Sequence, residues 1–210
     1  MKNQVKSRQR VVDHGEVFTA DREVNAMLDL VKDETMCVDS RFLEPACGDG
    51  NFVAEILHRK LETAKKIAIA SDNKKISISE YEKQSIIALA SIYGIDLMMD
   101  NVIACRKRLY EIWNKEYESV CKGKVKDECQ NAVKFILSKN IICGNTLSLK
   151  MVDKDGNDTD EIIVFSEWNF TMEDKIQRKD FRFDKMLSGE DEPICFYVSD
   201  YRSIQNCKTD

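Results

Sequence analysis

The sequence Phe-Leu-Glu-Pro-Ala-Cys-Gly-Asp-Gly-Asn-Phe, at residues 42–52, decides the predicted fold. Two apolar residues followed by Glu44 predict a short strand that ends in an acid. Gly48 and Gly50 then allow a tight turn, because glycine lacks the Cβ that would clash with a sharp bend or a nearby ligand. An apolar helix begins near Asn51 and presents its free N–H groups to the turn. A strand, a glycine loop and a helix in this order are typical of sites for nucleotides and nucleotide-like cofactors.

Further along the chain, short apolar segments alternate with helical patterns. Residues 92–96 and 140–145 each read as a strand with its turn, and residues 162–165 read as a fourth strand. Between the strands, apolar residues recur at the three- and four-residue spacing of amphipathic helices. The alternation predicts an α/β fold with a parallel sheet flanked by helices. A similar helical spacing before residue 41 predicts an N-terminal helical segment.

Polar residues end three of the predicted strands, at Glu44, Asp96 and Asn145. In doubly wound sheets, ligands bind just beyond the carboxyl ends of the strands. Acids also stand at strand ends simply because loops are solvated, so each position alone is ambiguous. Together with the glycine loop, the three positions predict one ligand site.

The composition is that of an ordinary globular domain. The chain has 210 residues, of which 43% are hydrophobic and 33% charged, enough for one domain with a core. No apolar run approaches the roughly 20 residues of a membrane span, and the basic start has no apolar signal core. We therefore expect a cytoplasmic protein without membrane contact.

Charge and cysteine spacing limit the partners that the chain can have. The net charge of −5 argues against a free-standing nucleic-acid binder, because phosphate contacts need clustered lysine and arginine. The eight cysteines lack the paired spacing of metal ligands, and there are only two histidines. We therefore expect no metal site and reduced, mostly buried thiols.

Two motifs resemble those of a known family. Residues 43–52, Leu-Glu-Pro-Ala-Cys-Gly-Asp-Gly-Asn-Phe, closely resemble the cofactor loop of the DNA adenine methyltransferases of restriction–modification systems. Residues 15–20, Gly-Glu-Val-Phe-Thr-Ala, resemble that family's upstream motif, with Ala20 where proline is usual. The resemblance covers residues 11–150. It implies a Rossmann-like methyltransferase fold with a mostly parallel sheet.

The resemblance also implies S-adenosyl-L-methionine as the cofactor. Asp96 is similar to the family's ribose-binding acid, although residues 63–85, interpreted as an inserted loop and helix, place it further from the glycine loop than usual. Gly144-Asn145-Thr146-Leu147 resembles the family's Gly-Asp-x-Leu motif, with Asn145 in place of the acid that accepts from the adenine amino group. The implied cofactor-binding residues are Phe18, Thr19, Glu44, Ala46, Gly48, Gly50, Asn51, Phe52, Asp96, Leu97, Asn145 and Thr146.

The family's catalytic motif, (Asn/Asp/Ser)-Pro-Pro-(Tyr/Phe), follows its fourth strand. This chain has Ser-Glu-Trp-Asn-Phe there, at residues 166–170, without either proline. The motif normally accepts hydrogen bonds from the target amino group and stacks an aromatic ring on the flipped base. By this comparison, the candidate catalytic residues are Glu167, Trp168 and Asn169. The alternative is a strand-to-loop exit with a buried tryptophan.

These observations predict one S-adenosylmethionine-dependent methyltransferase-like domain over residues 1–210. It would comprise an N-terminal helical cap (1–40), a Rossmann-like core (41–170) and a short C-terminal extension (171–210). The predicted function is methylation of the adenine N6 amino group in DNA, within a restriction–modification or mobile-element system. Few residues follow the fourth strand, so recognition of DNA is expected to need a partner subunit. The alternatives are an inactive cofactor-binding module, and methylation of RNA, protein or a small molecule.

Overall fold

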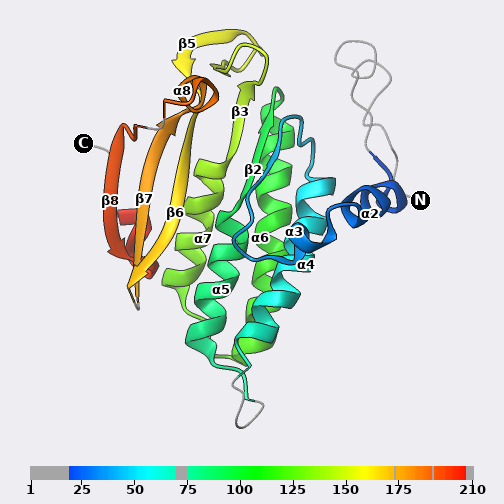
Figure 1. Ribbon diagram of the computed structural model, residues 1–210, viewed down its shortest axis with the longest axis vertical. Helices are drawn as coiled ribbons and strands as arrows, with labels where there is room; N and C mark the ends of the chain where they lie inside the picture. The colour runs from blue at the N-terminus through cyan, green and yellow to red at the C-terminus, as the bar shows by residue number, and fades with distance from the viewer. Residues whose placement is uncertain (1–18, 70–74, 173, 191, 207–210) are drawn as a thin grey trace.

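The protein is an α/β structure with two sheets (Figure 1). A computed structural model describes residues 19–69, 75–172, 174–190 and 192–206. Its helices are α2 (Asp21–Asp29), α3 (Lys32–Met36), α4 (Asn51–Ile67), α5 (Ile78–Ala90), α6 (Met99–Cys121), α7 (Asp127–Asn140), α8 (Phe183–Ser188) and the short 3-10 helix η1 (Tyr201–Asn206). Its strands are β1 (Phe42–Glu44), β2 (Ile92–Asp96), β3 (Ile141–Asn145), β4 (Lys150–Val152), β5 (Asp158–Ile162), β6 (Val164–Met172), β7 (Lys175–Arg182) and β8 (Cys195–Asp200).

The larger sheet is mixed and has the order β1-β2-β3-β4-β5. Strands β1, β2 and β3 run parallel, as the alternating sequence pattern predicted. Strands β4 and β5 then pair antiparallel, because a tight turn through Gly156, with its positive φ of 84°, returns the chain directly. The α/β class is therefore confirmed, with the parallel part of the sheet at one end.

The helices α4 to α7 cover one face of the parallel strands. Each connection carries two helices, α4 and α5 between β1 and β2, and α6 and α7 between β2 and β3. Parallel crossovers are almost always right-handed, so two successive steps in the same direction place their helices on the same face. The second helix of the first crossover, α5, accounts for the long distance in sequence between the glycine loop and Asp96.

Alternate residues of the central strands enter two different cores. Ile92 and Ile141 pack into the large core beneath the helices. Tyr93, Ile95 and Ile142 point to the opposite face and pack in a smaller core with residues of β6 and α8. Side chains alternate across a strand, so the near-continuous apolar runs of β2 and β3 fit a sheet that is covered on both faces.

The prediction of a fourth parallel strand at residues 162–165 is wrong. Residues 162–165 span the junction between β5, which ends at Ile162, and β6, which begins at Val164 in a separate antiparallel sheet of order β6-β7-β8. Residues 166–170 therefore lie within β6, paired with β7, and are not a loop beyond a strand. Figure 1 shows this second sheet beside α7. The pairing with β7, which follows β6 in the chain, explains why β6 does not continue the parallel sheet.

A buried carboxylate joins η1 to the helices. Glu82, on α5, is fully buried and accepts hydrogen bonds from the hydroxyls of Tyr117 at 2.8 Å and Tyr201 at 2.7 Å. Arg202 Nη2 lies 2.7 Å from Oε2, and Lys126 Nζ lies 3.2 Å from Oε1. A buried charge is tolerated only when it is paired and hydrogen-bonded, and these four donors meet that condition.

Lys60, on α4, is a second buried charge. Its Nζ donates to the carbonyl oxygens of Val38, at 3.3 Å, and Ser40, and to Ser91 Oγ at 2.7 Å. These contacts fix the segment that leads into β1. Burial lowers the pKa of Lys60 to about 8, because the charged amine loses its hydration.

We expect Lys60 to make stability depend on alkaline pH. Between pH 8 and the ordinary lysine pKa of about 10.4, the unfolded chain keeps a proton that folded Lys60 has lost. The free energy of unfolding should therefore rise with pH across this window, by up to about 1.4 kcal/mol per pH unit. Urea unfolding of the wild type and of Lys60→Met at pH 7.5–10 measures the effect, and parallel curves for the two proteins would contradict it.

Two further features of the described residues are the burial of the cysteines and the character of the helices. The seven cysteines within the described ranges form no disulfide, and five of them are buried, which confirms the prediction that the thiols are mostly buried. Across those same ranges, no helix combines the length and apolar character that crossing a membrane requires.

Candidate functional site

A pocket of about 590 Å³ opens at the carboxyl ends of β1, β2 and β3. We call it the carboxyl-edge pocket. Its position follows from the parallel strands, whose carboxyl ends meet at one edge of the sheet. The lining residues are Thr19, Glu44, Pro45, Ala46, Cys47, Gly48, Asn51, Phe52, Asp96, Leu97, Met98, Asn101, Gly144, Asn145, Thr146 and Leu147.

The two loop glycines have different tasks. Both have positive φ, 53° at Gly48 and 92° at Gly50, a region that side chains with a Cβ rarely adopt. Gly48 lines the pocket. Gly50 precedes α4 and packs against α6, where an added Cβ would lie only 2.8 Å from Cys105 Sγ. The loop is therefore open to a ligand at Gly48 and closed at Gly50.

Asp96 holds the glycine loop against the end of β2. Its Oδ2 accepts from the backbone N–H of Gly48 at 2.9 Å. Its Oδ1 accepts from the backbone N–H of Met98 at 2.8 Å and from Asn101 Nδ2 at 3.1 Å. The carboxylate thus faces the loop, as expected for a ligand-binding acid. Each oxygen of a carboxylate can accept more than one hydrogen bond, so capacity for a ligand hydroxyl remains.

The turn after β3 forms the opposite wall. Asn145 Oδ1 accepts from the backbone N–H of Leu147 at 3.0 Å, and Nδ2 donates to Asp158 at 3.0 Å. Thr146 Oγ1 donates to the carbonyl of Pro45 at 2.7 Å and so ties this turn to the loop after β1. The amide of Asn145 is fixed by these contacts, and its oxygen keeps one lone pair for an incoming donor.

The pocket is acidic. Glu44 and Asp96 are the charged residues in its lining, which contains no lysine or arginine among the described residues. Burial raises the pKa of Glu44, because the carboxylate loses hydration, and the backbone N–H of Ala46 offsets this only in part. Arg108, beside the glycine loop, is bound to Asn51 Oδ1 at 2.6 Å and Asp49 at 3.5 Å and lines a different cavity.

Most of the predicted cofactor-binding residues come together here. Ten of the twelve line the pocket, Gly50 lies behind it, and Phe18 lies outside the described residues. Sequence reasoning missed Pro45, Cys47, Met98, Asn101, Gly144 and Leu147. Five of these six adjoin a predicted site residue in sequence, which is the signal that could have found them. Asn101 lies in the first turn of α6, five residues after Asp96.

The candidate catalytic residues lie elsewhere, on opposite faces of β6. The indole of Trp168 donates to Asn140 Oδ1 at 2.8 Å and packs against Phe135 on α7. Glu167 pairs with Arg41 at 3.0 Å and accepts from Asn169 Nδ2 at 2.6 Å. None of the three lines the carboxyl-edge pocket. Trp168 is half-buried against α7 and lies within strand β6, so it is neither at the proposed site nor at the strand-to-loop exit that the alternative expected.

Comparison of this chain with protein-family models, with curated protein sequences and with solved structures found no match. The functional argument therefore depends on the chemistry of the pocket itself. Within the described part of the chain, no three histidine, cysteine, aspartate or glutamate side chains are grouped so that they could hold a metal ion.

Proposed function

We propose that the carboxyl-edge pocket binds S-adenosyl-L-methionine and that the chain is a methyltransferase-like domain. The observation that carries the proposal is an open glycine loop beside two acids, with no basic residue in the described lining. Sites for nucleoside triphosphates commonly add lysine or arginine to the helix N-terminus that binds the phosphates. S-adenosylmethionine has no phosphate and carries a sulfonium and an ammonium against one carboxylate, so an acidic pocket favours it.

The size and walls of the pocket suit a nucleoside. A volume of about 590 Å³ lies within the range of cofactor sites. Asp96 stands where it could accept from ribose hydroxyls, and Asn145 where it could accept from a base amino group. Leu97 and Leu147 both line the pocket and are 40% and 96% exposed, so a purine ring bound against them would cover apolar surface that now faces water.

The parallel strands support a Rossmann-like interpretation of this half of the fold. Strands β1, β2 and β3 are adjacent in that order, and the glycine loop follows the first of them. The β1 edge pairs with no other strand among the described residues. In a doubly wound sheet, a further strand at this edge would create the reversal of strand order at which ligands bind.

The proposed substrate is the adenine amino group of DNA, from the resemblance of residues 15–20 and 43–52. A second function, a cofactor-binding subunit without its own catalytic groups, is favoured by a specific observation. Glu167, Trp168 and Asn169 are engaged within the protein and lie outside the pocket lining. On that interpretation, a partner would supply both the catalytic motif and the DNA contacts.

A methyl-transfer assay separates the two functions. The chain is incubated with S-adenosylmethionine labelled in its methyl group and with mixed-sequence DNA, and the DNA is digested to nucleosides. If the isolated chain is a DNA adenine methyltransferase, we expect label in N6-methyl-2′-deoxyadenosine. Absence of label from a protein that still binds the cofactor would reject DNA methylation by the isolated chain and favour the subunit.

A further inference from the structure

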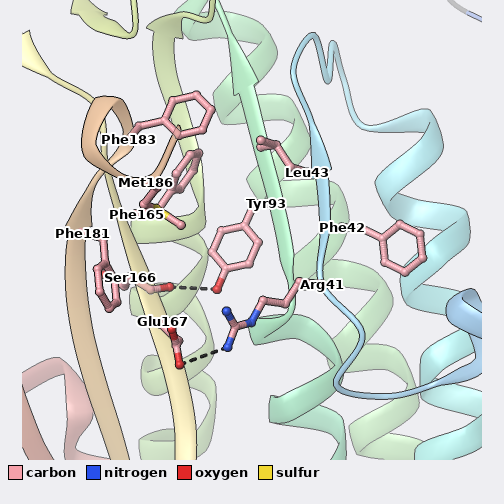
Figure 2. Close-up of a pocket in the computed structure, with 10 residues that line it drawn as sticks. All are labelled: Arg41, Phe42, Leu43, Tyr93, Phe165, Ser166, Glu167, Phe181, Phe183 and Met186. Carbon is pink, nitrogen blue, oxygen red and sulfur yellow. Dashed lines mark hydrogen bonds and ion pairs between the residues drawn. The ribbon is translucent and has the colours of Figure 1, made fainter. Parts of the chain in front are cut away.

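A second pocket lies between β1, β2 and the second sheet, and it shares no lining residue with the carboxyl-edge pocket. Its volume is about 170 Å³. Figure 2 shows aromatic side chains along one side, and Arg41 and Glu167 together at one end. Phe42 points away from this group, to the other side of β1. We call this site the aromatic pocket.

The walls of the aromatic pocket suit one flat ring. A cavity of about 150 Å³ lined by apolar side chains can hold benzene, so 170 Å³ admits a single ring with a small substituent. Phe165 meets Tyr93 at 5.4 Å and Phe183 at 5.2 Å between ring centroids, with interplanar angles of 80° and 79°. Perpendicular rings offer both edges and faces, the contacts that aromatic pairs prefer.

The polar end of the aromatic pocket offers an acceptor beside a donor. Arg41 Nη2 lies 3.0 Å from Glu167 Oε1, and Asn169 Nδ2 donates to the same oxygen at 2.6 Å. Glu167 Oε2 is therefore open to a ligand, as far as the described residues show. The guanidinium of Arg41, whose side chain is 53% exposed, has N–H groups to spare. An exposed ion pair of this kind contributes little to stability, so stability alone does not explain it.

We propose that the aromatic pocket binds an amino-substituted six-membered nitrogen heterocycle. The amino group of the ring would donate to Glu167, and the adjacent ring nitrogen would accept from Arg41. The ring itself would pack against Phe165 and Tyr93. Tyr93 is held for this contact, because its hydroxyl donates to the carbonyl of Ser166 at 2.9 Å. This site is independent of the proposed cofactor site.

The test compares two probes of the same shape. 4-Aminopyrimidine carries the required edge, and 4-methylpyrimidine replaces its donor with a methyl group. Titration of the full chain, followed through backbone amide NMR signals of the pocket residues, should show 4-aminopyrimidine binding in the millimolar range and about tenfold more tightly than 4-methylpyrimidine, because a hydrogen bond to a charged group is strong. Equal affinities for the two rings would overturn the proposal.

Variants of the chain locate the interaction. Glu167→Met should reduce the preference for the amino ring to less than about twofold, since the acceptor is lost while the wall remains. Met186→Trp should fill the pocket and abolish binding of both rings. If Met186→Trp alters the overall NMR spectrum, Leu43→Trp repeats the test from the β1 side. A preference that survives Glu167→Met, or binding that survives a folded blocking variant, would refute the site. Cytidine, as a third probe, shows whether the ligand of the pocket is a nucleoside or a free ring. Binding equal to that of 4-aminopyrimidine indicates a nucleoside, and weaker binding indicates a free ring.

Discussion

Glu82→Leu should lower the free energy of unfolding by about 3–5 kcal/mol, the usual cost of removing one partner from a buried ion pair. The substitution leaves Arg202, Lys126 and the hydroxyls of Tyr117 and Tyr201 without their common acceptor. Two of these residues belong to η1, so the C-terminal segment should loosen first. Denaturant unfolding, monitored by circular dichroism, measures the change.

Glu62→Leu is the matched control for this substitution. Glu62 lies on α4 and is exposed, so the same chemical change there should alter stability by less than about 0.5 kcal/mol. A loss from Glu82→Leu that is no larger than the loss from Glu62→Leu would show that the network does not hold η1 in place.

The Glu82 network should also be sensitive to acid. Burial raises the pKa of Glu82, but the donors Tyr201, Arg202, Tyr117 and Lys126 outweigh it and hold the pKa below its usual value. A carboxylate with a lowered pKa stabilises the fold fully above the unfolded value, about 4.3, and less as pH falls through the folded value. The stability difference between the wild type and Glu82→Leu should therefore shrink below pH 4.

Asp96→Ala should weaken S-adenosylmethionine binding at least 100-fold, which corresponds to about 2.7 kcal/mol. The variant loses the proposed acceptor for the ribose hydroxyls. It also frees the N–H of Gly48, which Asp96 now holds at 2.9 Å. Hydrogen bonds to a charged group contribute about 1.5–3 kcal/mol each, so two lost contacts account for this effect. Isothermal titration calorimetry of the folded variant measures it.

Asp49→Ala provides the control from the same loop. Asp49 pairs with Arg108 at 3.5 Å and is absent from the pocket lining, so its removal should change the affinity by less than about threefold, in line with the small energies of exposed ion pairs. If Asp49→Ala weakens binding as much as Asp96→Ala does, the effect comes from a disturbed loop and not from contacts of Asp96.

The parallel part of the fold could be predicted from local sequence because its signals are local. Each of these signals, whether the glycine loop or an apolar run with the acid or amide that ends it, occupies only a few consecutive residues. Those signals correctly brought Glu44, Asp96 and Asn145 to one edge.

The second sheet was missed for an identifiable reason. In β6, Trp168 and Phe170 alternate with Glu167 and Asn169, which is the period of a strand with two unlike faces. Residues 166–170 were instead compared with the family's catalytic motif, so their two-residue alternation was not interpreted as a strand. The contact of Glu82 with Tyr201 joins residues 119 apart in sequence. No local pattern predicts such a partner, because the distance depends on how the whole fold packs.

The most direct test of the account is a calorimetric titration of the wild-type chain with S-adenosylmethionine and, separately, with ATP. The acidic, glycine-lined pocket predicts one S-adenosylmethionine molecule per chain with a micromolar dissociation constant. It predicts ATP binding at least about 100-fold weaker, because phosphates would meet Glu44 and Asp96 without a neighbouring cation. No heat with S-adenosylmethionine, or equal affinity for ATP, would contradict the account.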